Sequence, residues 1–402
     1  MEKSVIRNIL ILLVAACTAA SVFISCSGDR VLDQYGVTSS IDSLVTGEFP
    51  GDAPGAVVMV SRGDTMVYSR AVGLARLDSV SKLSDHSMLN IASSTKTFTA
   101  AAILKLAEQG KLSLDDKITK YYPSLNDSVF GVITLRHILA NTSGIPDGRP
   151  STPEQWQTYL KDTKSVFGTA SDFRIYGKEK ELTRFIEKVD SLRFSPGSGF
   201  DRQDPPYMLL LKVIEQASGH TFENWMAENI FAPAGVDYAA YISSDRPIVG
   251  MAHAYRKADG KRNSNVFRSG DGRWDEYDYG EADFFLTRSD RGLYMSPRDF
   301  TKAIHALHDG KIISKESLDF YHTPMVTSGA AGQGYSLGLN IMVDDSGREK
   351  LYHRSTRGGF VAVEAFYPQA DVLYLIFSNR NDWDYNTFAD KIEAILHEKG
   401  MI

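Results

Sequence analysis

The stretch Leu89-Asn-Ile-Ala-Ser-Ser-Thr-Lys-Thr-Phe-Thr-Ala-Ala-Ala-Ile-Leu-Lys-Leu-Ala-Glu-Gln-Gly110 joins a short apolar lead-in to an apolar helical pattern that ends at a glycine. Phe98, Ala102 and Leu106 recur at the spacing of one helix face, so the stretch predicts a buried helix with Ser93 at its beginning. The helix therefore presents a hydroxyl at the entrance to an apolar core.

Ser93 and Lys96 form a candidate nucleophile and base. They lie three residues apart, so on a helix their side chains share one face and the lysine nitrogen can accept the serine proton. The backbone N–H groups of the first helical turn lack intrahelical partners, and their partial positive charge favours a serine alkoxide. The pair predicts acyl transfer through a serine ester. An ordinary helix-capping serine is the structural alternative.

The same Ser-x-x-Lys spelling occurs at Ser79-Val-Ser-Lys82. That copy lies in a polar stretch, residues 76–87, with no apolar helix behind it. The context therefore selects the copy at Ser93.

Composition and charge limit the classes of function. The chain has 402 residues, 43% hydrophobic and 23% charged, which allows one large globular domain or a few smaller ones. A net charge of -6 and a pI of about 5.9 argue against nucleic acid as a partner. The Gly270-Asp-Gly272 cluster does not open a helix, as a phosphate-binding nucleotide loop would. His305 and His308 could supply two metal ligands, but no third ligand is identifiable. We therefore expect no cofactor and no metal, and expect the two histidines to lie on a solvated helix face.

The N-terminus reads as an export signal. Lys3 and Arg7 precede an apolar run, residues 9–24, that is shorter than the roughly 20 residues of a spanning helix. The run ends in Phe23-Ile-Ser-Cys26, which resembles a bacterial lipoprotein cleavage site. We predict a signal peptide over residues 1–25, a lipid-anchored Cys26 and a tether over residues 26–43. The protein would then be periplasmic or at the cell surface, held on a membrane. An ordinary secretory signal with an incidental cysteine is the alternative.

Both cysteines fall in this N-terminal region, so no internal disulfide is expected in the exported domain. The rest of the chain has strand patterns near both ends and mainly helical patterns between them. The predicted elements are a hairpin over residues 55–68 turning at Arg62-Gly63-Asp64, helices over residues 207–219, 297–308 and 387–399, and strands over residues 360–367 and 372–378.

Residues 255–283 differ in character, being rich in Gly, Asp and Arg with interleaved aromatic residues. We predict a long excursion from the body of the protein. Its aromatic side chains, Phe267, Trp274, Tyr277 and Tyr279, either rim a substrate cleft or pin the loop to the body.

Several segments carry a family resemblance that covers nearly the whole chain after the N-terminal region. Together they resemble the serine β-lactamases, penicillin-binding peptidases and related esterases, in particular the class C branch. The segments are Ala92-Ser-Ser-Thr-Lys-Thr-Phe-Thr99, Gln109-Gly-Lys-Leu-Ser-Leu-Asp-Asp116, Ile138-Leu-Ala-Asn-Thr-Ser-Gly144, Phe194-Ser-Pro-Gly197, Tyr207-Met-Leu-Leu210 and Gly292-Leu-Tyr-Met-Ser-Pro-Arg-Asp299.

The resemblance implies an α/β (α+β) fold in residues 44–402. An antiparallel sheet formed from both chain ends and flanked by helices would comprise residues 44–120 and 290–402. An inserted, mainly helical domain would comprise residues 121–289, including the 255–283 excursion. The active site would lie between the two parts, with Ser93 at the base of the cleft.

The family's second motif, Tyr-x-Asn, is altered to Arg202-Gln203-Asp204. A guanidinium stays protonated and cannot share protons as the family's phenol is thought to do. Three interpretations remain open: a working enzyme in which Arg202 lowers the Lys96 pKa or binds a substrate carboxylate, a decayed site, or another tyrosine, such as Tyr176, entering the cleft. We include Arg202, Gln203 and Asp204 among the candidate substrate-binding residues.

The third motif, Lys/His-x-Gly, corresponds to His353-Arg-Ser355, followed by Thr356. Residues 353 and 355 share a strand face, so Ser355 would narrow the cleft where the family has glycine. By the resemblance, the Thr356 N–H joins the Ser93 N–H in an oxyanion hole, which needs only backbone atoms. His353 is a candidate catalytic residue or a structural core histidine.

The leading hypothesis is a serine hydrolase or acyltransferase that forms an acyl-enzyme with a small-molecule or peptide amide or ester, with water or another nucleophile as acceptor. The alternative is a catalytically decayed binding protein that recognises cell-wall peptide or another acylated ligand. The sequence predicts no particular oligomeric state.

Overall fold

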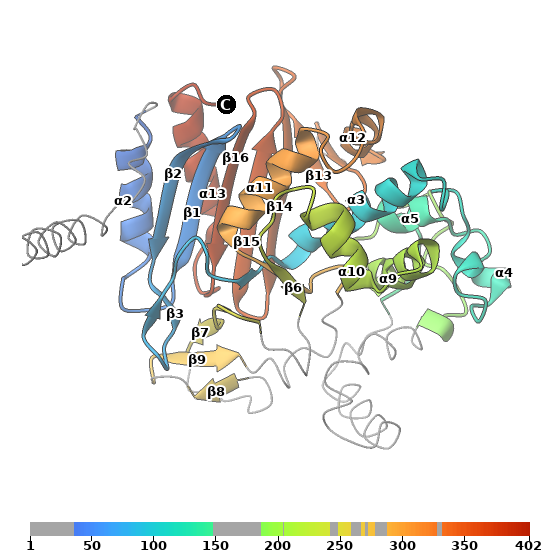
Figure 1. The fold of residues 1–402 in the computed structure, drawn as a ribbon, viewed down its shortest axis with the longest axis horizontal. Helices are drawn as coiled ribbons and strands as arrows, with labels where there is room; N and C mark the ends of the chain where they lie inside the picture. Colours follow the sequence, from blue (N-terminus) through green and yellow to red (C-terminus); the bar gives the residue numbers. More distant parts are fainter. Residues whose placement is uncertain are drawn as a thin grey trace, which may run out of the picture.

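The computed structural model describes residues 36–147, 186–203, 205–241, 248–258, 267–269, 272–277, 288–327 and 332–402. Within them an antiparallel sheet has the strand order β11-β12-β13-β14-β15-β16-β1-β2 (Figure 1). The strands are β1 Ala56–Arg62, β2 Thr65–Val72, β11 Val326–Thr327, β12 Gln333–Tyr335, β13 Asn340–Val343, β14 Glu349–Arg357, β15 Phe360–Tyr367 and β16 Val372–Ser378.

The middle of the sheet joins the two ends of the chain. Ile376 of β16 pairs with Val363 of β15 on one side and with Val58 of β1 on the other. Along β16 every side chain is buried, and alternate residues enter different cores. One core receives Val372, Tyr374 and Ile376, and the other receives Leu373, Leu375 and Phe377.

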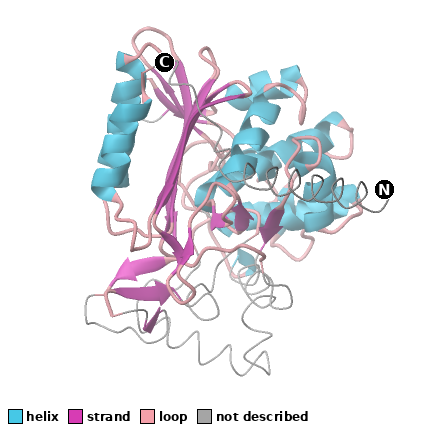
Figure 2. Cartoon of the chain, turned by 60° about the vertical axis from the view of Figure 1, so that its left-hand side comes forward, coloured by secondary structure: helices cyan, strands magenta, loops and turns pink. Residues whose placement is uncertain are grey.

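Helices α2 Thr38–Glu48 and α13 Tyr385–Glu398 cover one face of the sheet. Figure 2 shows helices on both sides of it. Ile41 and Val45 of α2 are fully buried. The tether predicted over residues 26–43 is therefore wrong at its C-terminal end, because α2 is already packed on the sheet there.

The opposite face carries helix α3 Thr95–Glu108, α11 Pro297–His308 and α12 Lys315–His322. Beyond α3 lies the helical part, formed by α4 Asp127–Phe130, α5 Leu135–Leu139, α9 Pro205–Ser218 and α10 Phe222–Met226, with the turns η2 Ile118–Lys120 and η3 Ala227–Phe231. The α/β class is confirmed: an antiparallel sheet built from both chain ends, with helices inserted between them (Figure 1). Among the described residues no helix is long and apolar enough to span a bilayer.

Three smaller sheets complete the described structure: β5-β10-β6 (Leu89–Asn90, Leu293–Met295, Ala239–Tyr241), β3-β4 (Leu74–Arg76, Ser81–Lys82) and β7-β9-β8 (Tyr255–Lys257, Trp274–Tyr277, Phe267–Ser269). The last falls in the predicted excursion. Trp274 and Tyr255 are buried there, which favours the interpretation that these aromatic residues pin the segment to the body. Tyr279 lies outside the described residues, and of Phe267 only the backbone is described.

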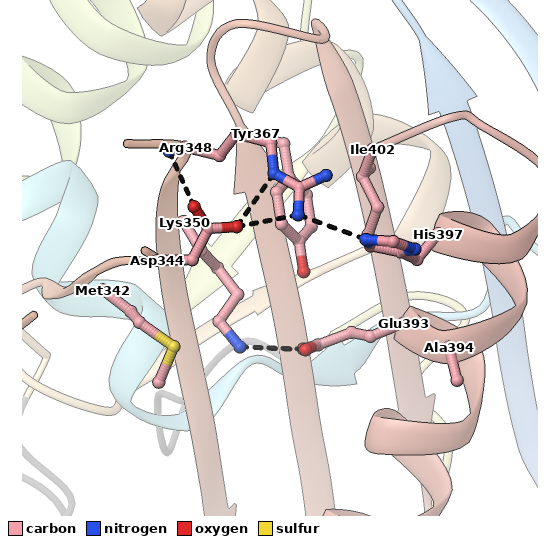
Figure 3. Close-up of a pocket in the computed structure, with 9 residues that line it drawn as sticks. All are labelled: Met342, Asp344, Arg348, Lys350, Tyr367, Glu393, Ala394, His397 and Ile402. Carbon is pink, nitrogen blue, oxygen red and sulfur yellow. Dashed lines mark hydrogen bonds and ion pairs between the residues drawn. The ribbon is translucent and has the colours of Figure 1, made fainter. Parts of the chain in front are cut away.

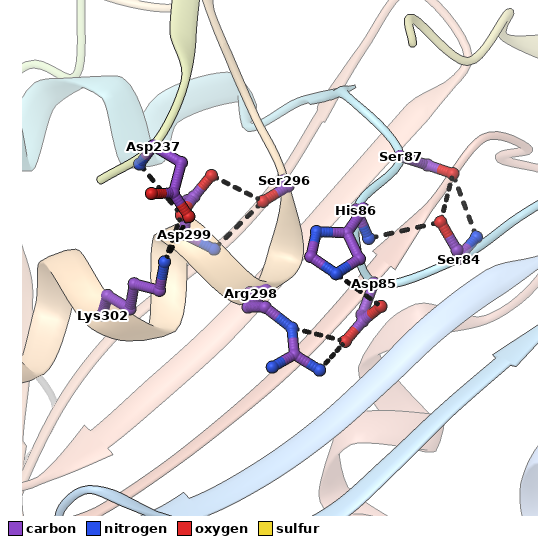
Figure 4. A network of polar contacts seen from close by, with 9 residues as sticks. All are labelled: Ser84, Asp85, His86, Ser87, Asp237, Ser296, Arg298, Asp299 and Lys302. Atoms are coloured by element: carbon purple, nitrogen blue, oxygen red, sulfur yellow. Dashed lines mark hydrogen bonds and ion pairs between the residues drawn. The ribbon is translucent and has the colours of Figure 1, made fainter. Parts of the chain in front are cut away.

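A polar network fixes the loop that leads into β5, which in turn leads to Ser93 (Figure 4). The Arg298 guanidinium, at the beginning of α11, donates to Asp85 at 2.8 Å. Ser296 caps the same helix end by accepting from the Asp299 N–H at 3.0 Å. The chain before Ser93 is therefore tied to the covering helix.

Candidate active site

Ser93 lies in the turn η1 Ala92–Ser94, which runs directly into α3. Ala92 has a φ of +46°, a conformation that costs a non-glycine residue energy. Asn90 holds it there: its Oδ1 accepts from the Ala92 N–H at 2.8 Å, and its Nδ2 donates to the Arg291 carbonyl at 3.0 Å. The sharp turn presents a half-buried Ser93 at the beginning of the helix.

Lys96 lies one turn further along α3 and is only 4% exposed. Burial lowers its pKa to about 7; Asp290 opposes this shift, and Arg291, Arg202 and Arg357 add to it. The ring of Tyr207 lies 5.5 Å from the Lys96 nitrogen. The lowered pKa favours the neutral amine, which is the form that can take a proton from serine.

The Ser93 hydroxyl makes no hydrogen bond to a described residue. Catalytic hydrogen bonds are often long in unliganded enzymes and form once substrate is bound. A proton transfer from Ser93 to Lys96 would use a hydrogen bond of this kind.

Asp290 is a functional candidate that the sequence did not single out. It is 1% exposed and acts on Lys96 electrostatically. Its neighbour Ser289 is fixed by both helices of the site, since Ser289 Oγ donates to the Tyr207 carbonyl at 3.1 Å and Thr99 donates to the Ser289 carbonyl at 2.7 Å. The only sequence feature that could have pointed to Asp290 is the Asp290-Arg291 pair just before the segment that begins at Gly292.

Arg202 is held against the edge of the sheet. Its guanidinium donates to Asn340 Oδ1 of β13 and stacks 5.4 Å from the centre of the Tyr335 ring. Asn340 is fixed in turn, because its Nδ2 donates to the Tyr352 carbonyl at 2.8 Å. Arg202 remains exposed, so its charge is available to a ligand as well as to Lys96.

The other residues of the second motif contribute less. The Gln203 side chain donates to Asp201 at 2.9 Å, within its own loop. Asp204 and Tyr176 lie outside the described residues.

Strand β14 carries the third motif on a stretch that β13 does not cover. The β13 pairing reaches β14 only as far as Tyr352, whereas β15 pairs with β14 through Arg357. The turn η1 packs against β14 and β15. Here the Ser93 N–H donates to Ser355 Oγ at 3.3 Å, and the Thr356 side chain is exposed. The structure thus brings Ser355 to Ser93.

His353 is part of a buried chain of polar contacts that includes Ser94, the residue after Ser93. Its two ring nitrogens lie 2.7 Å from Glu364 Oε1 and 2.7 Å from the Gly338 carbonyl. Ser94 Oγ donates to both Glu364 oxygens, at 2.8 and 2.7 Å. Burial raises the pKa of Glu364, and His353 and Ser94 act against that rise. His353 is 2% exposed with both nitrogens engaged, so this arrangement favours its structural role over the predicted catalytic contact.

Gly338 lies between this chain of contacts and Lys96, because its carbonyl contacts His353 and its Cα faces Lys96 and Tyr207. It has a φ of +86°, and a Cβ there would lie 2.4 Å from the Tyr207 hydroxyl and 3.0 Å from Lys96 Cβ. Only glycine allows this close approach. The Tyr207 hydroxyl is itself occupied, since it donates to the Leu139 carbonyl at 3.2 Å.

The far side of β14 is anchored to α13. Arg354, between His353 and Ser355, contacts Glu393 at 3.0 Å and Asp390 at 2.7 Å. Lys350 pairs with the same Glu393 at 2.9 Å, beside a cavity of about 300 Å³ (Figure 3). The charged groups that line this cavity pair with one another.

Of the two α11 histidines considered as metal ligands, His305 is buried and His308 is half-buried, so the solvated helix face expected for them is wrong. His305 Nε2 lies 2.8 Å from Ser61 Oγ, and His308 stacks on Phe366 with ring centres 4.0 Å apart. Burial lowers the pKa of both histidines. No group of three or more potential ligands in the described part of the chain could hold a metal.

Comparison with known proteins places this geometry in a family. The sequence profile of the Beta-lactamase family matches residues 41–397. The chain belongs to the Beta-lactamase family. This confirms the resemblance drawn from the sequence, and the family's relatives include serine hydrolases.

Related Beta-lactamase family sequences are distant. The Putative penicillin-binding protein PbpX of Bacillus subtilis (strain 168) is 24% identical over 342 residues, covering 85% of this chain and 75% of that protein. Protein flp of Staphylococcus aureus (strain COL) is 27% identical over 205 residues, covering 50% of this chain. The match spans 38% of Protein flp, so the chain corresponds to a part of that relative.

Solved structures share the fold. The octameric penicillin-binding protein homologue from Pyrococcus abyssi has a TM-score of 0.71 at 22% identity, covering 91% of this chain and 78% of that chain. The D-amino acid amidase from Ochrobactrum anthropi SV3 has a TM-score of 0.68 at 20% identity, covering 92% of this chain and 100% of that chain. EstCE1, a hydrolase with promiscuous acyltransferase activity, has a TM-score of 0.69 at 19% identity, covering 91% of this chain and 99% of that chain.

Proposed function

We propose that this protein is a serine hydrolase or acyltransferase that forms an acyl-enzyme on Ser93 with an amide or ester substrate. The observation that carries the proposal is a buried lysine with a pKa of about 7, one helical turn from a half-buried serine at a sharp turn. Two fold relatives, a D-amino acid amidase and a hydrolase with promiscuous acyltransferase activity, support the same chemistry.

In the proposed reaction, neutral Lys96 takes the proton from Ser93 Oγ as that oxygen bonds to the carbonyl carbon. The carbonyl oxygen gains negative charge and accepts hydrogen bonds from the Ser93 and Thr356 N–H groups. The bond to the leaving nitrogen or oxygen then breaks, and the Lys96 ammonium returns the proton to the leaving group. Water, an alcohol or an amine attacks the resulting ester and regenerates Ser93.

For the substrate, we propose an acyl donor that carries a carboxylate, bound through Arg202. The guanidinium is exposed and oriented by Asn340 and Tyr335, and a planar guanidinium is suited to binding a carboxylate. Asp204 was also predicted as substrate-binding and stays a prediction.

Intact-mass measurement tests the proposal. The protein is incubated with a fluorophosphonate, activated esters, a D-Ala-D-Ala peptide and a β-lactam, alongside Ser93→Ala and Lys96→Met. We expect an adduct on the parent protein, none on Ser93→Ala, and a strongly slowed reaction of Lys96→Met. An unmodified parent protein with every electrophile would refute the enzymatic proposal.

A second candidate is a binding protein without turnover. Two features favour it: Arg202 stands where the family's second motif has tyrosine, and the Ser355 hydroxyl accepts a hydrogen bond from the Ser93 N–H. Retained binding of a cell-wall peptide by Ser93→Ala, together with no turnover by the parent protein, would support it.

A further inference from the structure

One proposed oxyanion-hole donor is already engaged in the structure. The Ser93 N–H donates to Ser355 Oγ at 3.3 Å, and the Ser355 hydroxyl donates to the Ala362 carbonyl at 3.4 Å. An acyl oxygen that binds to the Ser93 amide must take the place of this hydroxyl.

The position of Ser355 is set by the strands around it. Ser355 pairs with Ala362 of β15, which places its side chain beside its own acceptor carbonyl. Two residues earlier on the same face, His353 is held from both sides at 2.7 Å. The β14–β15 pairing continues on both sides of Ser355, so the backbone holds this residue beside Ser93 and rotation of its side chain is the simplest way to move the hydroxyl away.

Both hydrogen bonds of Ser355 are long. Hydrogen bonds of 3.3–3.4 Å lie beyond the usual range of about 2.7–3.2 Å, so they are weak. An acyl donor whose carbonyl oxygen accepts hydrogen bonds strongly can therefore displace the hydroxyl from the Ser93 N–H. A donor whose carbonyl oxygen is a weak acceptor competes poorly for that N–H.

We propose that Ser355 is a specificity-determining residue whose hydroxyl occupies the oxyanion position in the resting protein and must rotate away before an acyl donor reacts. The proposal rests on the serine-enzyme function above. After rotation the side chain still fills part of the cleft beside the acyl group. The site then favours slender acyl donors over donors with a bulky ring next to the carbonyl.

Two substitutions separate the two effects. Ser355→Ala removes the hydroxyl and keeps the Cβ, so it should speed reaction with every donor. Ser355→Gly also removes the Cβ, so it should give a further gain with bulky donors only. Ser346→Ala is the matched control, because Ser346 lies in the turn after β13 and its hydroxyl donates only to Asp344.

The rate of fluorophosphonate labelling of Ser93 is the first readout. We expect Ser355→Ala to label about three- to tenfold faster than the parent protein, which corresponds to the net effect of one hydrogen bond. Ser346→Ala should label at the parental rate. Unchanged or slower labelling of Ser355→Ala would overturn the proposal, since slower labelling would mean that the hydroxyl assists the reaction.

The second readout does not depend on catalysis. Hydrogen exchange of the Ser93 amide, followed by NMR on ¹⁵N-serine-labelled protein, should be faster in Ser355→Ala than in the parent protein and unchanged in Ser346→Ala. Equal exchange in the parent protein and Ser355→Ala would overturn the proposal. If no variant is labelled but exchange in Ser355→Ala is faster, the enzymatic function fails while the occupied amide is supported.

Discussion

In the proposed mechanism, the protonation state of Lys96 determines whether Ser93 can react. Burial lowers the pKa of this lysine to about 7, and only its neutral form accepts a proton. We predict that the rate of Ser93 acylation rises as the pH increases through about 7 and levels off above it. Labelling rates measured between pH 5 and pH 9 check this. A profile that is flat across that range would exclude Lys96 as the base.

The charges around Lys96 set the position of this profile. Arg202 lowers the Lys96 pKa and Asp290 raises it. We predict that Arg202→Met shifts the midpoint to higher pH and Asp290→Asn shifts it to lower pH. Arg202→Lys keeps a charge at this position and should leave the midpoint close to the parental value. Equal midpoints in all four proteins would contradict the electrostatic role of Arg202.

The residues of the site differ in how far the sequence could reveal them. Ser93 and Lys96 could be singled out as candidates because they lie three residues apart where the turn η1 runs into α3, so their spacing is visible in the sequence. Asp290 and Glu364 were not, because they reach the site only through tertiary packing. His353 illustrates the middle case, since its strand face was predicted but its buried carboxylate partner could not be.

At the scale of elements, Glu364 joins the turn η1 to strands β14 and β15 through Ser94 and His353. We predict that Glu364→Gln lowers the acylation rate constant about tenfold, through loss of geometry, while the KM for an ester changes little. The free energy of unfolding in urea should fall by about 1–3 kcal/mol, because the buried His353 and Ser94 lose a hydrogen-bond acceptor. Glu398→Gln, with a 71% exposed side chain, is the control and should match the parent protein. A larger effect on KM than on the rate constant would argue against a positioning role.

Helix α13 offers a matched pair of carboxylates that contact Arg354. The Glu393 side chain is 19% exposed and also pairs with Lys350, whereas the Asp390 side chain is 65% exposed. We predict that Glu393→Ala lowers the free energy of unfolding by about 3–5 kcal/mol, since it leaves Lys350 without its carboxylate and leaves Arg354 only the exposed Asp390. Asp390→Ala should cost about 1 kcal/mol or less. Urea unfolding of both variants measures the difference, and equal losses would contradict the anchoring of β14 by Glu393.

The element predictions succeeded where local pattern and tertiary burial agreed. Strands β15 and β16 have the predicted bounds, because alternating apolar residues flank a Pro-Gln-Ala-Asp turn. Helix α2 was missed because Thr38-Ser-Ser-Ile-Asp looks like a polar linker, whereas its few apolar residues and the contacts of Asp42 with strand β2 hold it on the sheet. Strands β7, β8 and β9 were missed because three- and four-residue strands give no periodic signal.

At the scale of the whole molecule, we propose that Cys26 anchors the protein to a membrane as a lipoprotein. We predict that the parent protein incorporates a radiolabelled fatty acid and sediments with membranes, and that Cys26→Ser does neither. Cys17→Ser is the control, because Cys17 lies inside the proposed signal peptide and is not the proposed lipidation site. Equal labelling of Cys26→Ser and the parent protein would refute the anchor.

The placement of β16 between β15 and β1 has a consequence for folding. A nascent chain that ends before residue 372 has two separate half-sheets with open edges, so its main core cannot close. Such long-range pairing gives a high contact order and slow folding. We expect the newly made polypeptide to stay open until its last strand emerges, and deletion of the last strand and helix to yield an insoluble product rather than a smaller enzyme.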